Sequence, residues 1–241
     1  MVGQTLFRYV VCVLICISTQ DNGSATDSAR DSKSPELPHD LEVFSQAFPF
    51  NPGAGLTVRK IIQSYLPPRE TAEYLVKTYL EQASWIFQSV TPEQIKDEIL
   101  PEYYHTPIPT DDKPHQLALL FLVFAIGALV DLNKTPENAD AEHFHRVARA
   151  AMCLRSVIER PSFETIQALH LLSIYNAMSG NELAGQKTSM ETTWSLVSLA
   201  AHLSHTVCLS IMTASALMVF TIHYTSLGFV SILGCNGSQP N

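Results

Sequence analysis

Cysteine is scarce in this sequence, and the few cysteines are scattered. The chain of 241 residues has five, at Cys12, Cys16, Cys153, Cys208 and Cys235, and no two of them form a C-x2-C pair. Zinc sites that need such pairs are therefore excluded. The spacing gives no disulfide framework either, so the cysteines are more typical of a reducing compartment than of a secreted protein.

Positive charge is scarce as well. Lysine and arginine together number 15 against 23 aspartates and glutamates, which gives a formal net charge of −8 at pH 7. Proteins that bind nucleic acid carry a basic patch or stripe, because they must neutralise phosphates. The chain as a whole therefore has no electrostatic footprint for DNA or RNA.

Catalytic motifs are missing too. The sequence contains no H-E-x-x-H and no G-x-S-x-G, and no cysteine has a catalytic context. The segment Gly180–Thr188, GNELAGQKT, comes near a phosphate-binding loop, but Gln186 displaces the lysine by one position and a helix precedes it where a strand is needed. We predict no enzyme, no cofactor, and no catalytic, cofactor-binding or metal-binding residue in this chain.

Two histidine pairs have a spacing that metal ligands also use. His143-x-His145 follows Glu142, and His202-x-x-His205 lies later in the chain. Positions i and i+3 share one face of a helix, so the second pair could hold a metal if a third ligand joined it. No other motif supplies that ligand, and we interpret these histidines as surface or partly buried side chains.

Helical patterns, in contrast, are abundant. From Ser162 to Leu209 the sequence predicts two apolar helices joined by a hinge. Pro161-Ser162 begins the first, Ile166–Met178 leaves it almost no polar face, and Ser179-Gly180 ends it. Thr188 and Glu191 have the spacing of a capping box in the second helix. The apolar positions of that helix are Trp194, Val197, Leu199, Ala200, Ala201 and Leu203.

Two more helices are predicted nearer the N-terminus. Pro67-Pro68 begins one of them, because the missing N–H of proline costs nothing at a helix start. Its apolar stripe comprises Ala72, Leu75, Val76, Tyr79, Leu80, Ala83 and Phe87. Thr91-Pro92-Glu93 begins the next, which Pro101 should end. Before both of them, Leu41–Gly55 is predicted to be irregular and to dock its phenylalanines onto the domain.

The longest apolar run of the central region has 14 residues, Leu117–Val130, within a predicted helix Gln116–Leu132. The run is shorter than a membrane-spanning helix, so we expect the central buried helix of a bundle. Asp111 or Asp112 should cap its start, and Gly127 should allow a neighbouring helix to approach closely.

An amphipathic helix follows over Ala141–Ile158. Its inward-facing positions are predicted to be Phe144, Val147, Ala148, Ala151, Met152, Leu154 and Val157. No strand pattern competes in the region of these helices. The fold class is therefore predicted to be all-α, a helical bundle.

Four collinear segments also carry a resemblance. They are LPPRETAEYLVKTYLEQASWIF (Leu66–Phe87), LALLFLVFAIGALVDL (Leu117–Leu132), AEHFHRVARAAMCL (Ala141–Leu154), and ETIQALHLLSIY followed by W-x-L-x-x-LAAHLSH within Ser162–Thr206. These segments resemble the fungal-specific transcription factor domain, the regulatory region of zinc-cluster activators of the xylanolytic type. The resemblance covers residues 65–206 and only the first half of that domain, so a partial domain is expected.

The resemblance implies a function. It implies a regulatory domain that acts in the nucleus on RNA polymerase II transcription and responds to an effector, a partner protein or dimerisation. The family contacts DNA through a separate zinc cluster of six cysteines, which this chain lacks, so DNA is a partner of the family but not through this chain. Without the second half, apolar surface is expected on the helices Ile166–Met178 and Trp194–Leu203, with poor solubility.

The two ends of the chain differ from its middle. Residues 1–64 are predicted to be a leader and a disordered linker, because residues 21–40 are rich in Ser and Asp. Residues 207–241 form a divergent tail, and residues 192–241 contain no Lys, Arg, Asp or Glu. The tail has three interpretations: a membrane anchor, a buried helix or strand, or a retained intron or frameshift, since Val207-Cys208 can be encoded by a common fungal intron start.

These ends support an alternative function. Residues 1–20 have the length of a secretory signal peptide, with an apolar run over Tyr9–Ile17, and Thr206–Leu233 is long enough to span a bilayer. The alternative is therefore a membrane-anchored or secreted helical protein without catalytic activity. Residues 1–20 also fit a retained intron or frameshift, the last of the three interpretations given for the tail.

Overall fold

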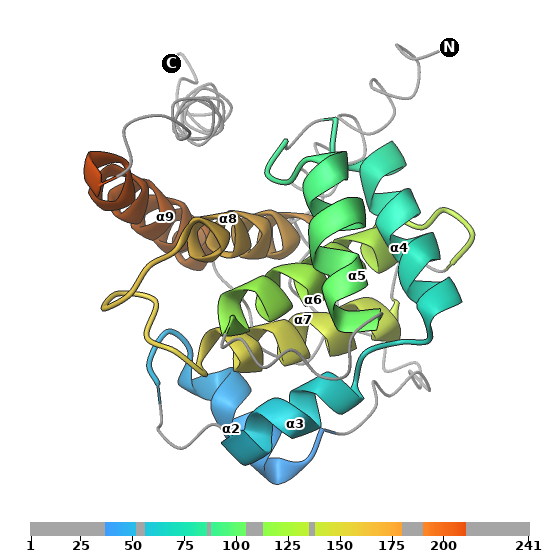
Figure 1. Cartoon of the computed structure of the whole chain (residues 1–241), viewed down its shortest axis with the longest axis horizontal. Helices are drawn as coiled ribbons and strands as arrows, with labels where there is room; N and C mark the ends of the chain where they lie inside the picture. The colour runs from blue at the N-terminus through green and yellow to red at the C-terminus, as the bar shows by residue number, and fades with distance from the viewer. Residues whose placement is uncertain are drawn as a thin grey trace, which may run out of the picture.

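Helix α6 (Pro114–Leu129) is the central element of the fold. The structure is a computed structural model, which describes residues 37–51, 56–85, 88–104, 113–134, 138–179 and 190–210. Every residue of α6 from Pro114 to Ala128 is buried, and helices α4, α7 and α8 pack against it (Figure 1). A helix that is apolar on every side needs neighbours on every side, which explains its place at the centre.

The described residues form eight α-helices and one π-helical turn, and they contain no strand. In chain order these are α2 (His39–Ala47), α3 (Leu56–Ser64), α4 (Arg69–Gln82), the π-helical turn η1 (Gln94–Ile99), α5 (Leu100–Tyr104), α6, α7 (Ala139–Met152), α8 (Phe163–Met178) and α9 (Met190–Ser210). The prediction of an all-α helical bundle is confirmed.

The helices lie around α6 in a simple order. Helix α7 packs between α6 and α2, and α8 packs between α6 and α9, so α9 lies at the edge of the described bundle (Figure 1). The stretch predicted to be irregular begins as helix α2, and this part of the prediction is wrong. Docking is confirmed for Phe44, which is buried in the core, and for Phe48, which packs partly buried against it, whereas Phe50 is 71% exposed and does not dock.

Gly127 brings α4 and α6 unusually close together. A Cβ atom built at Gly127 would lie 2.3 Å from the backbone oxygen of Leu75 on α4, closer than real Cβ contacts come. Glycine is the only residue that leaves this space empty. The predicted close approach at Gly127 is confirmed.

Several helix ends differ from the sequence prediction. Pro101 does not end a helix: it lies inside α5, which follows η1 without a break and continues to Tyr104. The preceding π turn is wider than an α turn, and Leu100 N–H bonds to Ile95 O, five residues back. That geometry tolerates a proline that would clash with the carbonyl four residues back in a regular α-helix.

Helices α6 and α7 are also placed differently from their predictions. Helix α6 starts at Pro114, with Lys113 as an N-cap that makes no side-chain bond, and ends at Leu129. The proposed caps Asp111 and Asp112 lie outside the described residues. Helix α7 ends at Met152 instead of residue 158, because the chain turns there and buries Val157 separately.

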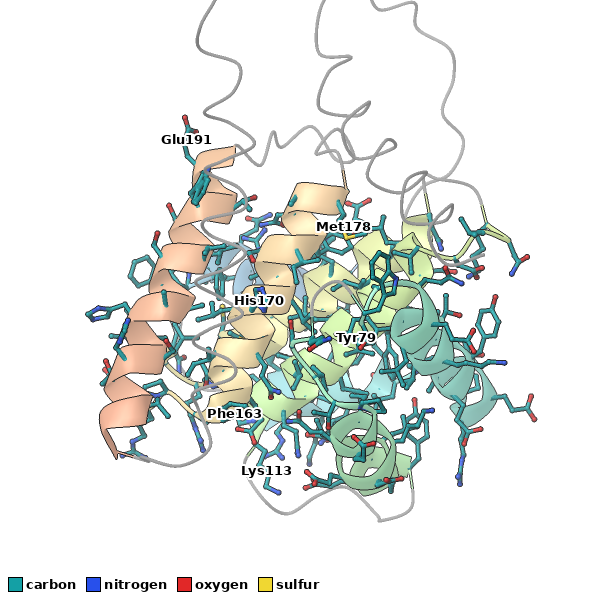
Figure 2. The ribbon with its side chains drawn as sticks, turned by 90° about the horizontal axis from the view of Figure 1, so that it is seen from above. Tyr79, Lys113, Phe163, His170, Met178 and Glu191 are labelled. Carbon is teal, nitrogen blue, oxygen red and sulfur yellow. The ribbon has the colours of Figure 1, made fainter. Side chains whose placement is uncertain are left out.

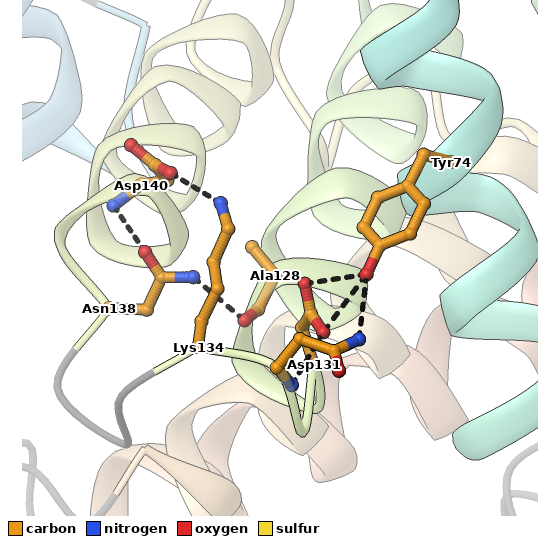
Figure 3. A network of polar contacts seen from close by, with 7 residues as sticks. Tyr74, Ala128, Asp131, Lys134, Asn138 and Asp140 are labelled. Carbon is orange, nitrogen blue, oxygen red and sulfur yellow. Dashed lines mark hydrogen bonds and ion pairs between the residues drawn. The ribbon is translucent and has the colours of Figure 1, made fainter.

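The turn between α6 and α7 is held by a polar network (Figure 3). The Asn138 side chain accepts the N–H of Asp140 at 3.0 Å and donates to the backbone oxygen of Ala128 at 2.9 Å. The Asp131 carboxylate accepts the Tyr74 hydroxyl at 3.0 Å. One asparagine therefore caps the start of α7 and satisfies a buried carbonyl near the end of α6.

Replacing Asn138 with alanine should lower the free energy of unfolding by about 2 kcal/mol, because the N-cap is lost and the Ala128 carbonyl is left unpaired. Urea unfolding followed by circular dichroism measures this difference. Lys134→Ala is the matched control, since it removes only the exposed ion pair of Lys134 with Asp140 at 2.7 Å and should change stability by at most about 0.5 kcal/mol. Equal effects of the two variants would contradict this role for Asn138.

The predictions for the two ends concern residues that the structure mostly leaves undescribed. Residues 1–36 and 211–241, which include most of the proposed leader and tail, lie outside the described ranges. Within the part that is described, none of the helices combines the length and the hydropathy needed to cross a bilayer.

Candidate functional site

A groove between α4 and the η1–α5 segment is the candidate site. It has a volume of about 290 Å³. Its lining combines an apolar floor with charged groups and comprises Arg69, Glu73, Val76, Lys96, Leu100, Pro101 and Tyr104. We call it the α4–α5 groove. A hollow with an apolar floor and a few charged groups is the kind of surface that binds small molecules.

Local sequence signals build both walls of this groove. Pro67-Pro68 precedes α4 and places Arg69 at its first position, and the Tyr104 hydroxyl donates to the Pro67 carbonyl at 2.6 Å. This bond ties the end of α5 to the start of α4. Burial raises the pKa of Tyr104, so its hydroxyl keeps the proton that it donates. The π turn places Ile95 and Ile99 in the core while Lys96 is exposed at the groove.

The charges at the groove are unequal. Arg69 Nε lies 2.7 Å from a Glu73 carboxylate oxygen, and both side chains are half exposed. Within the part of the chain that the structure describes, Lys96 makes no ion pair and no hydrogen bond through its side chain. Glu102 on α5 pairs with Lys113 at 3.3 Å instead. The lining therefore carries one more positive than negative charge.

Helix α8 carries buried polar groups that bond to the segment before η1. Ser89 Oγ lies 2.7 Å from His170 Nδ1, and Gln167 Nε2 donates to the Ser89 carbonyl at 2.7 Å. His170 lies midway between the ends of α8 at Phe163 and Met178 (Figure 2). Burial lowers the pKa of His170 to about 4, so its imidazole is neutral at physiological pH. These contacts fix α8 in the core, where a substrate has no access to the serine–histidine pair.

A second buried histidine joins the starts of α6 and α8. His115 Nδ1 lies 2.6 Å from Thr165 Oγ1, and its Nε2 lies 3.2 Å from the Arg155 carbonyl. Thr165 also completes a capping box with Ser162, which confirms the predicted start of α8. Burial lowers the pKa of His115. This histidine therefore connects three parts of the chain and serves the fold.

His143 and His145, which have the spacing of metal ligands in the sequence, contact different neighbours and do not form a common site. The His143 ring lies edge-on to Tyr65 at 5.1 Å, whereas the His145 ring stacks on Tyr175 at 4.2 Å. Burial, and then two neighbouring arginines, lower the pKa of His145 to about 3. Its Nε2 is buried without a hydrogen-bond partner. Both rings therefore pack as neutral aromatic groups.

The other candidate residues are likewise spread apart. His202 and His205 are exposed on α9, and no cluster of three or more potential metal ligands occurs among the residues that the structure describes. The whole near-match to a phosphate-binding loop, residues 180–188, lies outside the described ranges, and so does Thr188 of the proposed capping box. Cys153 is buried, and burial raises the pKa of its thiol to about 12, so it is not a reactive thiolate.

Of the two helices expected to expose apolar surface, α8 exposes none over residues 165–176 and α9 exposes it only in part. Residues Thr165 to Asn176 of α8 are all buried, so the prediction is wrong for this helix, which the rest of the bundle covers. Helix α9 buries one stripe, with Leu196, Ala200 and Leu203 against the core. Beside that stripe, Trp194, Val197 and Ala201 are only half-buried.

Sequence reasoning did not find the α4–α5 groove. Arg69 and Lys96 are exposed residues of two different elements, and their positions in the chain have no motif-like spacing. Only the packing of α4 beside η1 and α5 brings them together. The signals nearest to it are the adjacent prolines at 67–68, which precede the start of α4, and Pro101, which lies inside the other wall and lines the groove.

The chain was compared with known proteins in three ways. A family model described as the fungal specific transcription factor domain matches residues 85–210, more than half of the chain. No curated protein and no solved structure matches. The matched range contains η1 and every helix from α5 to α9, and therefore includes one wall of the α4–α5 groove.

Proposed function

The chain belongs to the fungal specific transcription factor domain family, a family of regulatory domains, and we propose that it is the regulatory part of a zinc-cluster DNA-binding transcription factor. In this proposal it acts in the nucleus on transcription by RNA polymerase II. The DNA reader lies outside this chain, on a longer product or on a partner protein. The family match over residues 85–210 is the observation that carries the proposal.

The net charge and the cysteine content of the sequence support a regulatory chain whose DNA reader is separate. A net charge of −8 disfavours direct contact with phosphates, and five scattered cysteines without a C-x2-C pair cannot supply the six ligands of the family's zinc cluster. The chain should therefore influence transcription through contacts with proteins or effectors rather than through DNA.

Helix α9 is the surface through which such a protein contact would be made. It lies at the edge of the described bundle, with its buried stripe against α8 and with Trp194, Val197 and Ala201 half-buried beside that stripe. Apolar positions at i, i+3 and i+7 form one row along a helix, which suits packing against a partner helix. An effector in the α4–α5 groove would act on the opposite part of the bundle, at α4 and α5.

Tagging the protein in its native cells tests the proposal. We expect the tagged chain in the nuclear fraction, and we expect crosslinking to recover promoter DNA with it. Purified chain alone should not retard duplex DNA at physiological salt, because it lacks the reader. If the chain pellets with membranes in a carbonate-resistant form and recovers no promoter DNA, the proposal fails and the membrane-anchored alternative replaces it.

A further inference from the structure

We propose that the α4–α5 groove binds a small amphiphilic carboxylate. Its acid group lies between Lys96 and Arg69, and its apolar part lies on Val76, Leu100 and Pro101. The proposal that the groove binds such an acid is argued from the geometry of the groove alone. The reading of the bound acid as a regulatory effector rests on the proposed function.

The excess positive charge of the groove lining favours a carboxylate as the ligand. One of the two cations, Arg69, is already paired with Glu73 at 2.7 Å, whereas Lys96 makes no side-chain ion pair or hydrogen bond within the described ranges. The formal charge of the chain is −8, so a local excess of positive charge is against the general trend of its surface. A carboxylate that enters the groove gains an ion pair with Lys96, while a cation or a neutral group gains none.

The apolar floor of the groove favours a ligand that carries an apolar part. Val76 and Leu100 are buried members of the core cluster, at 1% and 8% exposure, and they form the floor of the groove together with Pro101. Burial of apolar ligand surface on such a floor is favourable in water. A small ionic ligand such as acetate has little apolar surface of its own to bury on this floor, so the ligand should carry a ring or a short chain.

The volume limits the size of the ligand. A cavity of about 150 Å³ holds one benzene molecule, so the 290 Å³ of this groove suits a ligand of roughly ten heavy atoms. The fixed contact of Tyr104 with Pro67 at 2.6 Å keeps the two walls at one separation. A ligand of this size therefore meets a preformed site.

The test uses 3-phenylpropionate as the probe and 3-phenylpropanol as its uncharged counterpart. The full chain, labelled with ¹⁵N, is titrated with each compound while its amide resonances are followed by NMR. We expect the acid to shift resonances of α4, η1 and α5 with a dissociation constant in the millimolar range, as a ligand of about eleven heavy atoms allows. The alcohol should bind about fivefold more weakly, since it lacks the ion pair.

Two variants locate the binding. Lys96→Gln should weaken the acid about fivefold and leave the alcohol unchanged. Lys77→Gln is the matched control, because Lys77 lies on α4 outside the groove and pairs loosely with Glu81 at 3.9 Å. It should leave both affinities unchanged. Equal affinity for acid and alcohol, insensitivity to Lys96→Gln, or resonance shifts outside the groove would each overturn the proposal.

The outcome is separable from that of the proposed function. Binding is measured on the purified chain and needs no transcription, whereas nuclear and promoter association needs no ligand. A chain that associates with promoters but does not bind the acid at the groove removes this site and leaves the proposed function intact. If the chain binds the acid but is not recovered with chromatin, the binding site is retained, but the acid is no longer interpreted as a regulator of transcription.

Discussion

Gly127→Ala should destabilise the bundle by about 3 kcal/mol, even though alanine is a better helix former than glycine. The new Cβ would lie 2.3 Å from the Leu75 backbone oxygen and 3.1 Å from its carbonyl carbon. A flexible side chain could turn away from such a contact, but backbone atoms in the middle of α4 cannot. Helix α4 must therefore move away from α6, and the packing of Leu75 and Val76 on α6 is loosened.

The sign of the change in the free energy of unfolding shows whether α4 lies against Gly127. If α4 did not lie against Gly127, alanine would raise the free energy of unfolding by about 1 kcal/mol through helix propensity alone. Urea unfolding of the two proteins, followed by circular dichroism, distinguishes the two cases. Ser198→Ala, an exposed change to alanine on α9, is the control and should leave stability the same or slightly higher. A stabilised Gly127→Ala protein would contradict the α4–α6 contact.

Acidification from pH 7 to pH 5 should remove at least about 4 kcal/mol of stability, about 2 kcal/mol for each of His145 and His170. The lowered pKa values of His115 and His143 add to this loss. Burial lowers their pKa in the folded chain to about 3 and about 4, below the value near 6.5 that an unfolded chain gives. Between those values the unfolded chain binds more protons than the folded one. Stability is therefore complete above about pH 6.5 and is lost progressively as the pH falls toward the folded values.

One substitution isolates the contribution of His145. Phenylalanine keeps an aromatic ring against Tyr175, which lies 4.2 Å from the His145 ring, but it cannot be protonated. His145→Phe should therefore reduce the loss between pH 7 and pH 5 by about 2 kcal/mol, whatever its stability at pH 7. Ser198→Ala, an exposed change on α9 that removes no titratable group, should leave the pH dependence as it is. A His145→Phe protein that loses as much stability as the wild type on acidification would refute the assignment.

Local sequence signals were sufficient for some elements of this fold. Ser162 caps α8 as predicted, and the unbroken apolar run does form the buried centre in α6. Gly127 was identified correctly because a glycine in the middle of an apolar helix has few other uses. In each case the deciding interaction is local, or the pattern is extreme enough to leave one solution.

Other features depend on contacts that no local pattern records. Pro101 was predicted to end a helix, yet the wider turn before it accommodates the ring, and Leu100 bonds to Ile95 instead. The serine and histidine of the Ser89–His170 pair lie 81 residues apart. His145 was predicted to lie at the surface or partly buried and is fully packed on Tyr175, because α7 is covered by neighbours on more faces than its amphipathic pattern suggests.

The candidate site belongs to this second group. Its charged groups are ordinary exposed residues in the sequence, and the groove exists only because α4 packs beside η1 and α5. The family resemblance, on the other hand, was visible from four collinear segments and is confirmed by the match over residues 85–210. The family could thus be inferred from sequence, whereas the surface through which this member could respond to a ligand required the three-dimensional packing.

The most direct test of the central claim is a transcription measurement on the whole chain, fused to an unrelated DNA-binding domain that is inert by itself. If the chain is a regulatory domain, the fusion changes transcription of a reporter that carries the matching DNA site, relative to the DNA-binding domain alone. The Gly127→Ala fusion, at equal protein abundance, should lose that effect because its α4–α6 packing is disrupted. Reporter transcription equal to that of the DNA-binding domain alone would contradict the claim that this chain regulates transcription.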